Sequence, residues 1–158
     1  MTRLRHEHLI RINDASIPPS EWLTRRQLWE GLLHTVLTPQ SLDESIDAAT
    51  VLERSAGVFR REIRREIRRG GLTLVDAAEL VTDESVVIRC DSQGKFGGST
   101  FTMRIEEPEP QMLFVRFVYE LFGLEDERTE EEDNARRSAY QTLDVERIRE
   151  ARRHAGAH

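Results

Sequence analysis

Hydrophobic and polar residues alternate with a period of two along much of this chain, which is the pattern of a strand with one buried face. Two runs show it most clearly, and their apolar positions are Phe101, Met103 and Ile105 in the first and Leu113, Val115, Phe117 and Tyr119 in the second. Residues 5–12 alternate in the same way, and turn residues divide residues 45–120 into segments of roughly 8–12 residues. The pattern predicts one strand near the N-terminus and about six more after residue 45.

A helix is predicted between Thr24 and Pro39. Thr24 suits the N-cap position, and Gln27 stands three residues later, as in a capping box. A broad apolar face that includes Trp29 and Leu33 indicates packing against the sheet. The helix should end before Pro39, which cannot continue it.

A second, long helix is predicted from about Glu130 to Arg153. Its first turn is acidic and its last turn is basic, which matches the helix dipole at both ends. Small residues recur at Ala135 and Ala139, and Leu143 follows four residues later. We expect this stripe to face the sheet, where small side chains let the helix lie close or leave room beside it.

The run from Val58 to Arg69 is basic and has two interpretations. With the helical period, Phe59, Ile63 and Ile67 form one apolar stripe on a basic helix, which is typical of a surface for nucleic acid, an acidic membrane or an acidic partner. With a period of two, the same residues share a strand face with two arginines. Glycines flank the run in either case, but its neighbours are strand-length segments, which favours the strand.

The strand interpretation points Arg61 and Arg65 into a half-buried wall. A buried guanidinium requires a carboxylate partner, access to solvent or an anionic ligand. Asp76 and Glu79 on the following strand are candidate partners, whereas a bulge or an open end of the sheet would let the arginines reach water. If either arginine reaches a cavity, it favours a ligand with an apolar body and a carboxylate or enolate head.

The composition suits a single domain spanning residues 1–158, with a net charge of −6. An acidic chain is not the usual footprint of a nucleic-acid binder, so no nucleic-acid partner is expected. No apolar segment approaches the length of a membrane span, and we expect a cytoplasmic protein without membrane insertion. Cys90 is the single cysteine, which excludes an internal disulfide and a cysteine-based metal framework. We expect no cofactor, and either a monomer or a homodimer.

The order of the predicted elements is strand, helix, about six strands and a long terminal helix, which indicates an α+β fold. The most economical packing curves the antiparallel sheet around the terminal helix. Six segments resemble, in the right order, landmarks of the AtaL-like proteins, a group within the START-like (SRPBCC, helix-grip) superfamily. These segments are Ile12–Asp14, Leu23–Gly31, Val51–Glu53, Ile105–Pro108, Leu113–Glu120 and Arg137–Tyr140.

This resemblance, which covers nearly the whole chain, implies a curved antiparallel sheet that grips a long C-terminal helix around a hydrophobic cavity. Members of the superfamily bind lipids, sterols and aromatic metabolites, and some are cyclases, dehydratases or activators of chaperones. The resemblance supplies no catalytic residue to carry over to this chain. Fold alone does not establish function.

Several smaller motifs carry weak chemical signals. His6 and His8 share a strand face at a spacing that can place two imidazoles on one metal, but no third ligand is evident, and exposed histidines on an edge strand are the simpler interpretation. Cys90 follows the alternation of a small buried hydrophobe, and no base can be placed to activate it. Gly94–Gly98 lacks the phosphate-binding spacing and is predicted to be a loop, where Phe96 would guard the mouth of a cavity.

The leading hypothesis is a protein that binds a small hydrophobic or aromatic metabolite in an internal cavity, with an anionic head on the ligand if the arginines face inward. In a helix-grip fold the same positions are core and cavity lining at once. The residues expected at this site are Trp29, Leu33, Arg61, Ile63, Arg65, Phe101, Met103, Phe117, Tyr119, Ala139, Tyr140 and Leu143.

Two other hypotheses remain open. One is a cyclase or dehydratase that acts on a polyketide-like or aromatic metabolite. Its polar groups to test as acid, base or oxyanion partner are Tyr119, Tyr140, His8 and Arg61. The other is an interaction module that uses the arginine-rich run or the acidic run Glu125–Asp133 as a surface for a protein partner.

Overall fold

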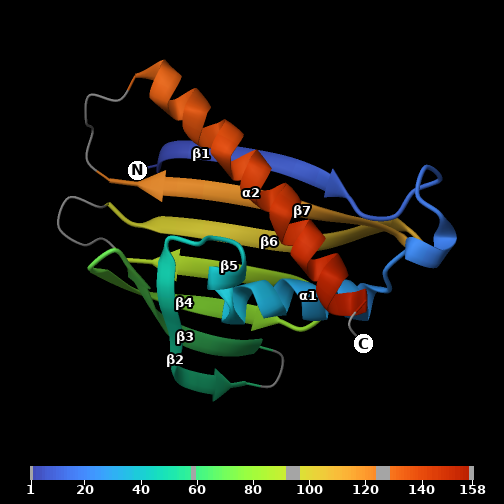
Figure 1. Cartoon of the computed structure of the whole chain (residues 1–158), viewed down its shortest axis with the longest axis horizontal. Helices are drawn as coiled ribbons and strands as arrows, with labels where there is room; N and C mark the ends of the chain where they lie inside the picture. The colour runs from blue at the N-terminus through green and yellow to red at the C-terminus, as the bar shows by residue number, and fades with distance from the viewer. Residues whose placement is uncertain (1, 58–59, 92–96, 124–128, 157–158) are drawn as a thin grey trace.

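The computed structural model describes residues 2–57, 60–91, 97–123 and 129–156. These residues form a seven-stranded antiparallel sheet with two α-helices on one face (Figure 1). The strands are β1 (Thr2–Arg11), β2 (Ile46–Ala56), β3 (Arg60–Arg69), β4 (Leu72–Val81), β5 (Ser85–Cys90), β6 (Ser99–Glu109) and β7 (Met112–Phe122). The helices are α1 (Arg25–Leu37) and α2 (Glu130–Gly156), and short 3-10 turns at Pro19–Glu21 and Pro39–Ser41 flank α1.

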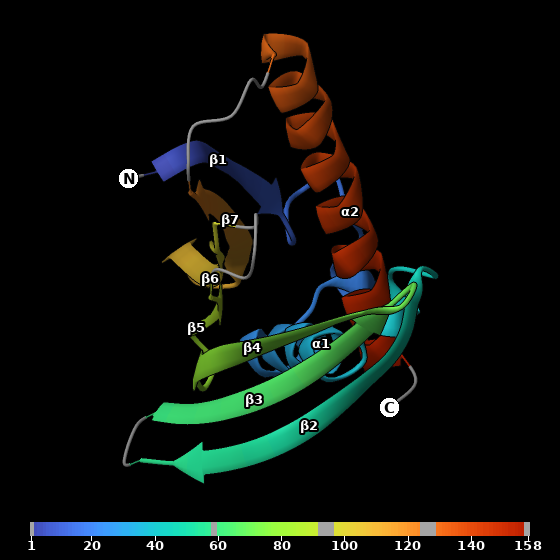
Figure 2. The same ribbon diagram turned by 90° about the vertical axis from the view of Figure 1, so that its left-hand side faces the viewer.

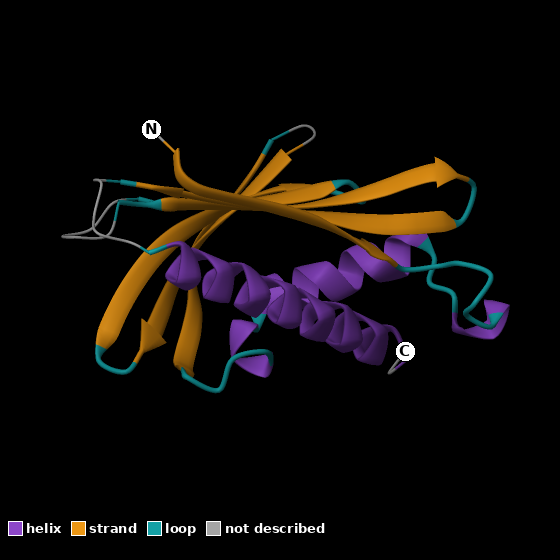
Figure 3. Ribbon diagram, turned by 90° about the horizontal axis from the view of Figure 1, so that it is seen from above, coloured by secondary structure: helices purple, strands orange, loops and turns teal. Residues whose placement is uncertain are grey.

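The strand order is β1-β7-β6-β5-β4-β3-β2, so each strand from β2 to β7 pairs with its neighbour in sequence, and β7 also pairs with β1. The sheet is strongly curved, and Figure 2 shows β2, β3 and β4 bending around the side on which the helices lie. Figure 3 shows α2 crossing this concave face beside α1. The α+β helix-grip fold expected from the sequence is therefore confirmed, including the six strands after residue 45 and the helical segment after the first strand.

Helix α1 begins with the capping box that the sequence predicts. The hydroxyl of Thr24 accepts a hydrogen bond from the backbone N–H of Gln27, and the Gln27 side chain accepts one from the backbone N–H of Thr24. These two bonds satisfy backbone donors that the first turn of a helix leaves free. The helix ends at Leu37, before Pro39, and its apolar face, which includes the buried Trp29, packs into the core.

The arginine-rich run forms strand β3, as the strand interpretation predicts. Ile63, Arg65 and Ile67 are buried, whereas Arg64 between them is exposed and Glu66 is half-buried. This alternation follows from pairing on both edges, because β3 forms antiparallel ladders with β2 and with β4. Phe59, expected on the same face, lies outside the described residues.

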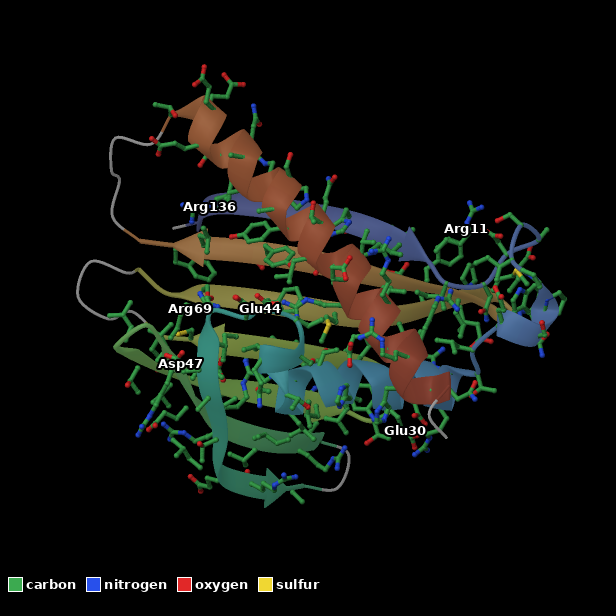
Figure 4. All side chains as sticks on the ribbon, viewed as in Figure 1. Arg11, Glu30, Glu44, Asp47, Arg69 and Arg136 are labelled. Carbon is green, nitrogen blue, oxygen red and sulfur yellow. The ribbon has the colours of Figure 1, made fainter. Side chains whose placement is uncertain are left out.

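Most of the charge on β3 is balanced by nearby acids. The ion pairs of its arginines are Arg60–Glu79, Arg65–Asp76, Arg68–Glu66 and Arg69–Asp43. The partners come from β3 itself, from β4 and from the turn before β2. The remaining exposed charges are spread over the molecule, as Figure 4 shows from Arg136 on α2 to Glu30 on α1.

The orientation of α2 differs from the prediction. Ala135 and Ala139 are exposed, so the expected stripe of small residues does not face the sheet, although Ile148 and Ala151 are buried as expected. The reason is the contact with α1: a Cβ added to Gly31 would lie only 2.6 Å from the Cβ of Ala151, so the two helix backbones nearly touch there. This contact fixes the rotation of α2, with Ala151 inward and Ala135 and Ala139 outward.

Asn13, from the first of the family-like segments, has a structural role. Its buried amide group donates hydrogen bonds to the carbonyl oxygens of Leu23 and Gln111 and accepts one from the backbone N–H of Leu23. The side chain therefore ties the segment between β1 and α1 to the turn between β6 and β7. Within the described residues, no helix is long and apolar enough to cross a membrane.

Candidate functional site

A pocket of about 300 Å³ lies between the concave face of the sheet and the two helices. We call it the inner pocket, and the residues of its wall that matter below are Arg65, Asp76, Phe101, Tyr119, Tyr140 and Arg147. Hollows of about 420 and 460 Å³ lie at the opposite end of the molecule, around Trp22 and Leu23. The inner pocket is the better candidate site because aromatic rings and ionisable groups with shifted pKa values converge there.

Aromatic rings form one wall of the inner pocket. The rings of Tyr119 on β7 and Tyr140 on α2 stack with centroids 3.8 Å apart and planes only 5° from parallel. Phe101 on β6 lies with its centroid 4.6 Å from that of Tyr119. Strand pairing explains the second contact, because Phe101 and Tyr119 are opposite each other in the β6–β7 ladder. The stack connects the sheet to α2 where the alanines do not.

A buried carboxylate lies next to this wall. Asp144 on α2 has no exposed surface, and its oxygens accept hydrogen bonds from the hydroxyl of Tyr119 at 2.6 Å and from Nε of Arg147 at 3.1 Å. Nε2 of His8, on β1, lies 2.6 Å from the other oxygen. A carboxylate without partners would be strongly destabilising at this depth, so these groups make its burial possible.

The pKa values in this cluster are shifted by burial. Desolvation raises the pKa of Asp144, although Arg147 and the hydrogen bonds from Tyr119 and His8 partly oppose the rise. Desolvation also raises the pKa of Tyr119, against the opposing charge of Arg147. The pKa of His6, whose ring stacks on His8 with centroids 5.3 Å apart, is lowered by burial and by the charge of His8. Burial is therefore the largest cause of each of these three pKa shifts.

Arg65 lines the inner pocket, but its guanidinium group is hydrogen-bonded to other groups of the protein. Its Nε and one Nη donate to the two carboxylate oxygens of Asp76, at 2.8 and 2.7 Å, and the other Nη donates to the carbonyl oxygen of Val36 near the end of α1. Asp76 is one of the two partners that the sequence suggests, and the other, Glu79, pairs with Arg60. Arg61 lies in the exposed first part of β3 and does not line the pocket.

The structure brings four of the twelve predicted site residues together on the wall of the inner pocket, and these are Arg65, Phe101, Tyr119 and Tyr140. Four others are buried in the core, and these are Trp29, Ile63, Met103 and Phe117. Leu33 and Leu143 are partly buried away from the pocket, and Ala139 and Arg61 are exposed.

Asp144 and Arg147 are the functional candidates that sequence reasoning missed. Asp144, Ile148 and Ala151 have the spacing of one helix face, so a carboxylate on that face was a detectable signal of a buried charge. Within the described residues, no group of three metal-ligating side chains accompanies the histidines of β1. Cys90 lines the pocket, and burial raises the pKa of its thiol, which disfavours the reactive thiolate. Phe96 lies outside the described residues.

A seven-stranded antiparallel sheet curved around a long C-terminal helix defines the helix-grip fold. The sequence model of the AtaL family, described as acetylaranotin biosynthesis cluster protein L, matches residues 10–157. The chain belongs to this family. No curated protein matches the sequence.

Solved structures share the fold at low sequence identity. The ZhuI aromatase/cyclase from Streptomyces sp. R1128 is 14% identical with a TM-score of 0.63, over 99% of this chain and 94% of that chain. The di-domain aromatase/cyclase StfQ from the steffimycin biosynthetic pathway is 10% identical with a TM-score of 0.66, over 97% of this chain. This chain spans 51% of StfQ, about half its length. Ara h 8.0201 is 9% identical with a TM-score of 0.61, over 98% of this chain and 99% of that chain.

Proposed function

We propose that the protein binds a small hydrophobic or aromatic metabolite in the inner pocket. The observation that carries this proposal is the aromatic wall, in which Phe101, Tyr119 and Tyr140 form a continuous series of rings at the edge of the pocket. Planar apolar groups pack well against such rings in offset or edge-on arrangements. A volume of about 300 Å³ is at the small end of the range for ligand sites, so we expect a compact ligand.

The comparisons support a small molecule as the ligand. The description of the AtaL family refers to a biosynthesis cluster, and ZhuI and StfQ are aromatase/cyclases. Because the likeness to these structures is one of fold, the ligand of this chain is inferred from its own pocket.

The test fills the inner pocket and leaves the rest of the strand unchanged. Leu74 on β4 lines the pocket, whereas Leu72, two residues earlier on the same strand, is 67% exposed and lies outside it. We expect calorimetric titration with naphthol to show binding by the wild type and by Leu72→Trp, and at least roughly tenfold weaker binding by Leu74→Trp. Equal affinity of Leu74→Trp and the wild type, with the fold intact by circular dichroism, would contradict binding in this pocket.

A second candidate function is that of a cyclase or dehydratase, and the convergence of Tyr119 and His8 on Asp144 favours it. In a dehydration, a base removes the proton next to a carbonyl and an acid protonates the departing hydroxyl group. Tyr119 lines the pocket, and its oxygen would accept the proton next to the carbonyl while its own proton moves along the hydrogen bond to Asp144, which His8 supports. Tyr119 would then protonate the departing hydroxyl group, which leaves as water, and Asp144 would return the proton to Tyr119. This arrangement would place acid–base chemistry at the aromatic wall.

The measurement for this function is the formation of a conjugated enone from an aryl β-hydroxy ketone, followed by absorbance. Tyr119→Phe should lower the rate by at least roughly a hundredfold while naphthol binding is retained, because only the hydroxyl group is removed. If the wild type binds naphthol but turns over no such ketone, binding without catalysis remains the function.

A further inference from the structure

We infer that Arg147 binds an oxyanion of the ligand, so that the inner pocket takes a planar aromatic carboxylate or enolate. This inference rests on the proposed binding function and assigns the ligand class and the residue that selects it. The sequence suggested Arg61 or Arg65 for this role, whereas the geometry favours Arg147 on α2.

Arg147 combines burial with unused donors. Its side chain is only 14% exposed, and it lines the inner pocket. Its Nε donates a hydrogen bond to Asp144, and a further hydrogen-bond interaction joins it to the hydroxyl of Tyr119. A guanidinium group has five N–H donors, so these two interactions leave donors at its Nη end. A guanidinium group can make two parallel hydrogen bonds from its Nη atoms to one carboxylate. This end of Arg147 is therefore available to a ligand.

The side chain is also held in place before a ligand arrives. The guanidinium carbon lies 4.6 Å from the centroid of the Phe101 ring, and Asp144 fixes the Nε edge. Asp144 is itself held by Tyr119 and His8, so it does not depend on the Nη atoms of Arg147. Binding to a group that is already ordered loses less conformational entropy. The anion would lie beside Phe101 and thus beside the aromatic wall.

The other arginines of the pocket are committed to protein partners. Each of the three guanidinium nitrogens of Arg65 already donates, two of them to Asp76 and one to the carbonyl oxygen of Val36. Arg69 pairs with Asp43, and its side chain is 49% exposed. A ligand carboxylate would have to displace Asp76 from Arg65, but among the described residues no carboxylate is bonded to the Nη atoms of Arg147. The structure therefore favours Arg147.

The experiment compares naphthoate with naphthamide, its neutral analogue of almost the same shape, by calorimetric titration at neutral pH. We expect the wild type to bind naphthoate roughly ten- to a hundredfold more tightly than naphthamide. Arg147→Met should remove this preference by weakening naphthoate alone, because methionine retains an apolar stem over Phe101. Arg149→Met is the matched control, since Arg149 lies two residues later on α2, is 65% exposed and pairs with Glu146. It should keep the preference.

The outcomes separate this inference from the function on which it rests. Equal binding of the two compounds by the wild type, lost in Leu74→Trp, overturns the role of Arg147 and leaves the pocket standing. A preference for naphthoate that persists in Arg147→Met also overturns the role of Arg147 and leaves the pocket standing. Absence of binding of either compound by the wild type overturns both proposals. If Arg147→Met does not fold, Arg147→Gln removes the charge while keeping an amide that can donate to Asp144, and the same outcomes apply.

Discussion

Replacement of Arg65 by methionine tests whether the buried ion pair on β3 supports the fold. The side chains of Arg65 and Asp76 are 9% and 10% exposed, and two charge-assisted hydrogen bonds join them. A third bond from Arg65 reaches the carbonyl oxygen of Val36, which links β3 to the end of α1. Methionine has a similar length but no donor, so Arg65→Met leaves the carboxylate of Asp76 in the wall without its partner.

The expected loss is large because an unpaired charge remains at low exposure. Removing one partner of a buried pair lowers the free energy of unfolding by about 3–5 kcal/mol. In a chain of this size, a loss of about 3 kcal/mol corresponds to a fall of roughly 6–12 °C in Tm. Arg60→Met provides the scale for an exposed pair on the same strand. Arg60 is 71% exposed and makes one ion pair with Glu79, so its loss should be within about 1 kcal/mol.

Urea denaturation of both variants measures the difference, and a double variant identifies its cause. Arg65→Met combined with Asp76→Leu removes both charges, so it should unfold at a higher urea concentration than Arg65→Met alone, because apolar pairs often replace buried ion pairs without loss. The reasoning is refuted if Arg65→Met is no less stable than Arg60→Met. It is also refuted if adding Asp76→Leu to Arg65→Met lowers the free energy of unfolding by a further amount of similar size, as it would if the two side chains stabilised the fold independently.

Two further predictions concern the helix contact and the aromatic wall. Gly31→Ala should destabilise the protein by about 1–3 kcal/mol in thermal unfolding, because the new Cβ would lie 2.6 Å from that of Ala151, whereas Gly156→Ala, with nothing within 4 Å, should have little effect. Tyr140→Phe leaves Tyr119 as the one tyrosine of the chain. Because the pKa of Tyr119 is raised in the folded state, its contribution to stability is complete below the unfolded pKa of about 10 and is lost as the pH rises above that value. Phenolate absorbance should therefore appear only as the protein unfolds, and a titration near pH 10 with the fold intact would contradict the burial of this hydroxyl group.

The fold could be predicted from the sequence because its signals are local. The capping box of Thr24 and Gln27 involves residues three apart, and the alternation of Ile63, Arg65 and Ile67 is set by the geometry of a single strand. The inward direction of Arg65 followed from the same alternation, and its partner Asp76 lies on the adjacent strand. Such contacts depend on little beyond the type and order of the elements.

The face of α2 could not be predicted in the same way. The spacing of four residues that connects Ala135 and Ala139 also connects Tyr140 and Asp144, so periodicity offers two faces and does not choose between them. The choice depends on the close contact of Gly31 on α1 with Ala151 on α2, and on a tyrosine stack, both of which are tertiary contacts. A preference for small residues at the interface therefore selected the wrong face.

The polar cluster depends even more on tertiary structure, because its members come from both ends of the chain. His8 and Asp144 are 136 positions apart, and Tyr119 and Asp144 are 25 apart, so no local pattern connects them. Judged by residue type alone, an aspartate on a charged helix such as Asp144 is expected at the surface. It can be buried only when β1, β7 and α2 are all in place, since each supplies part of its hydrogen bonding. Docking of α2 therefore assembles the wall of the inner pocket and positions Arg147 in the same step, so the pocket and the packing of the last helix should be lost together.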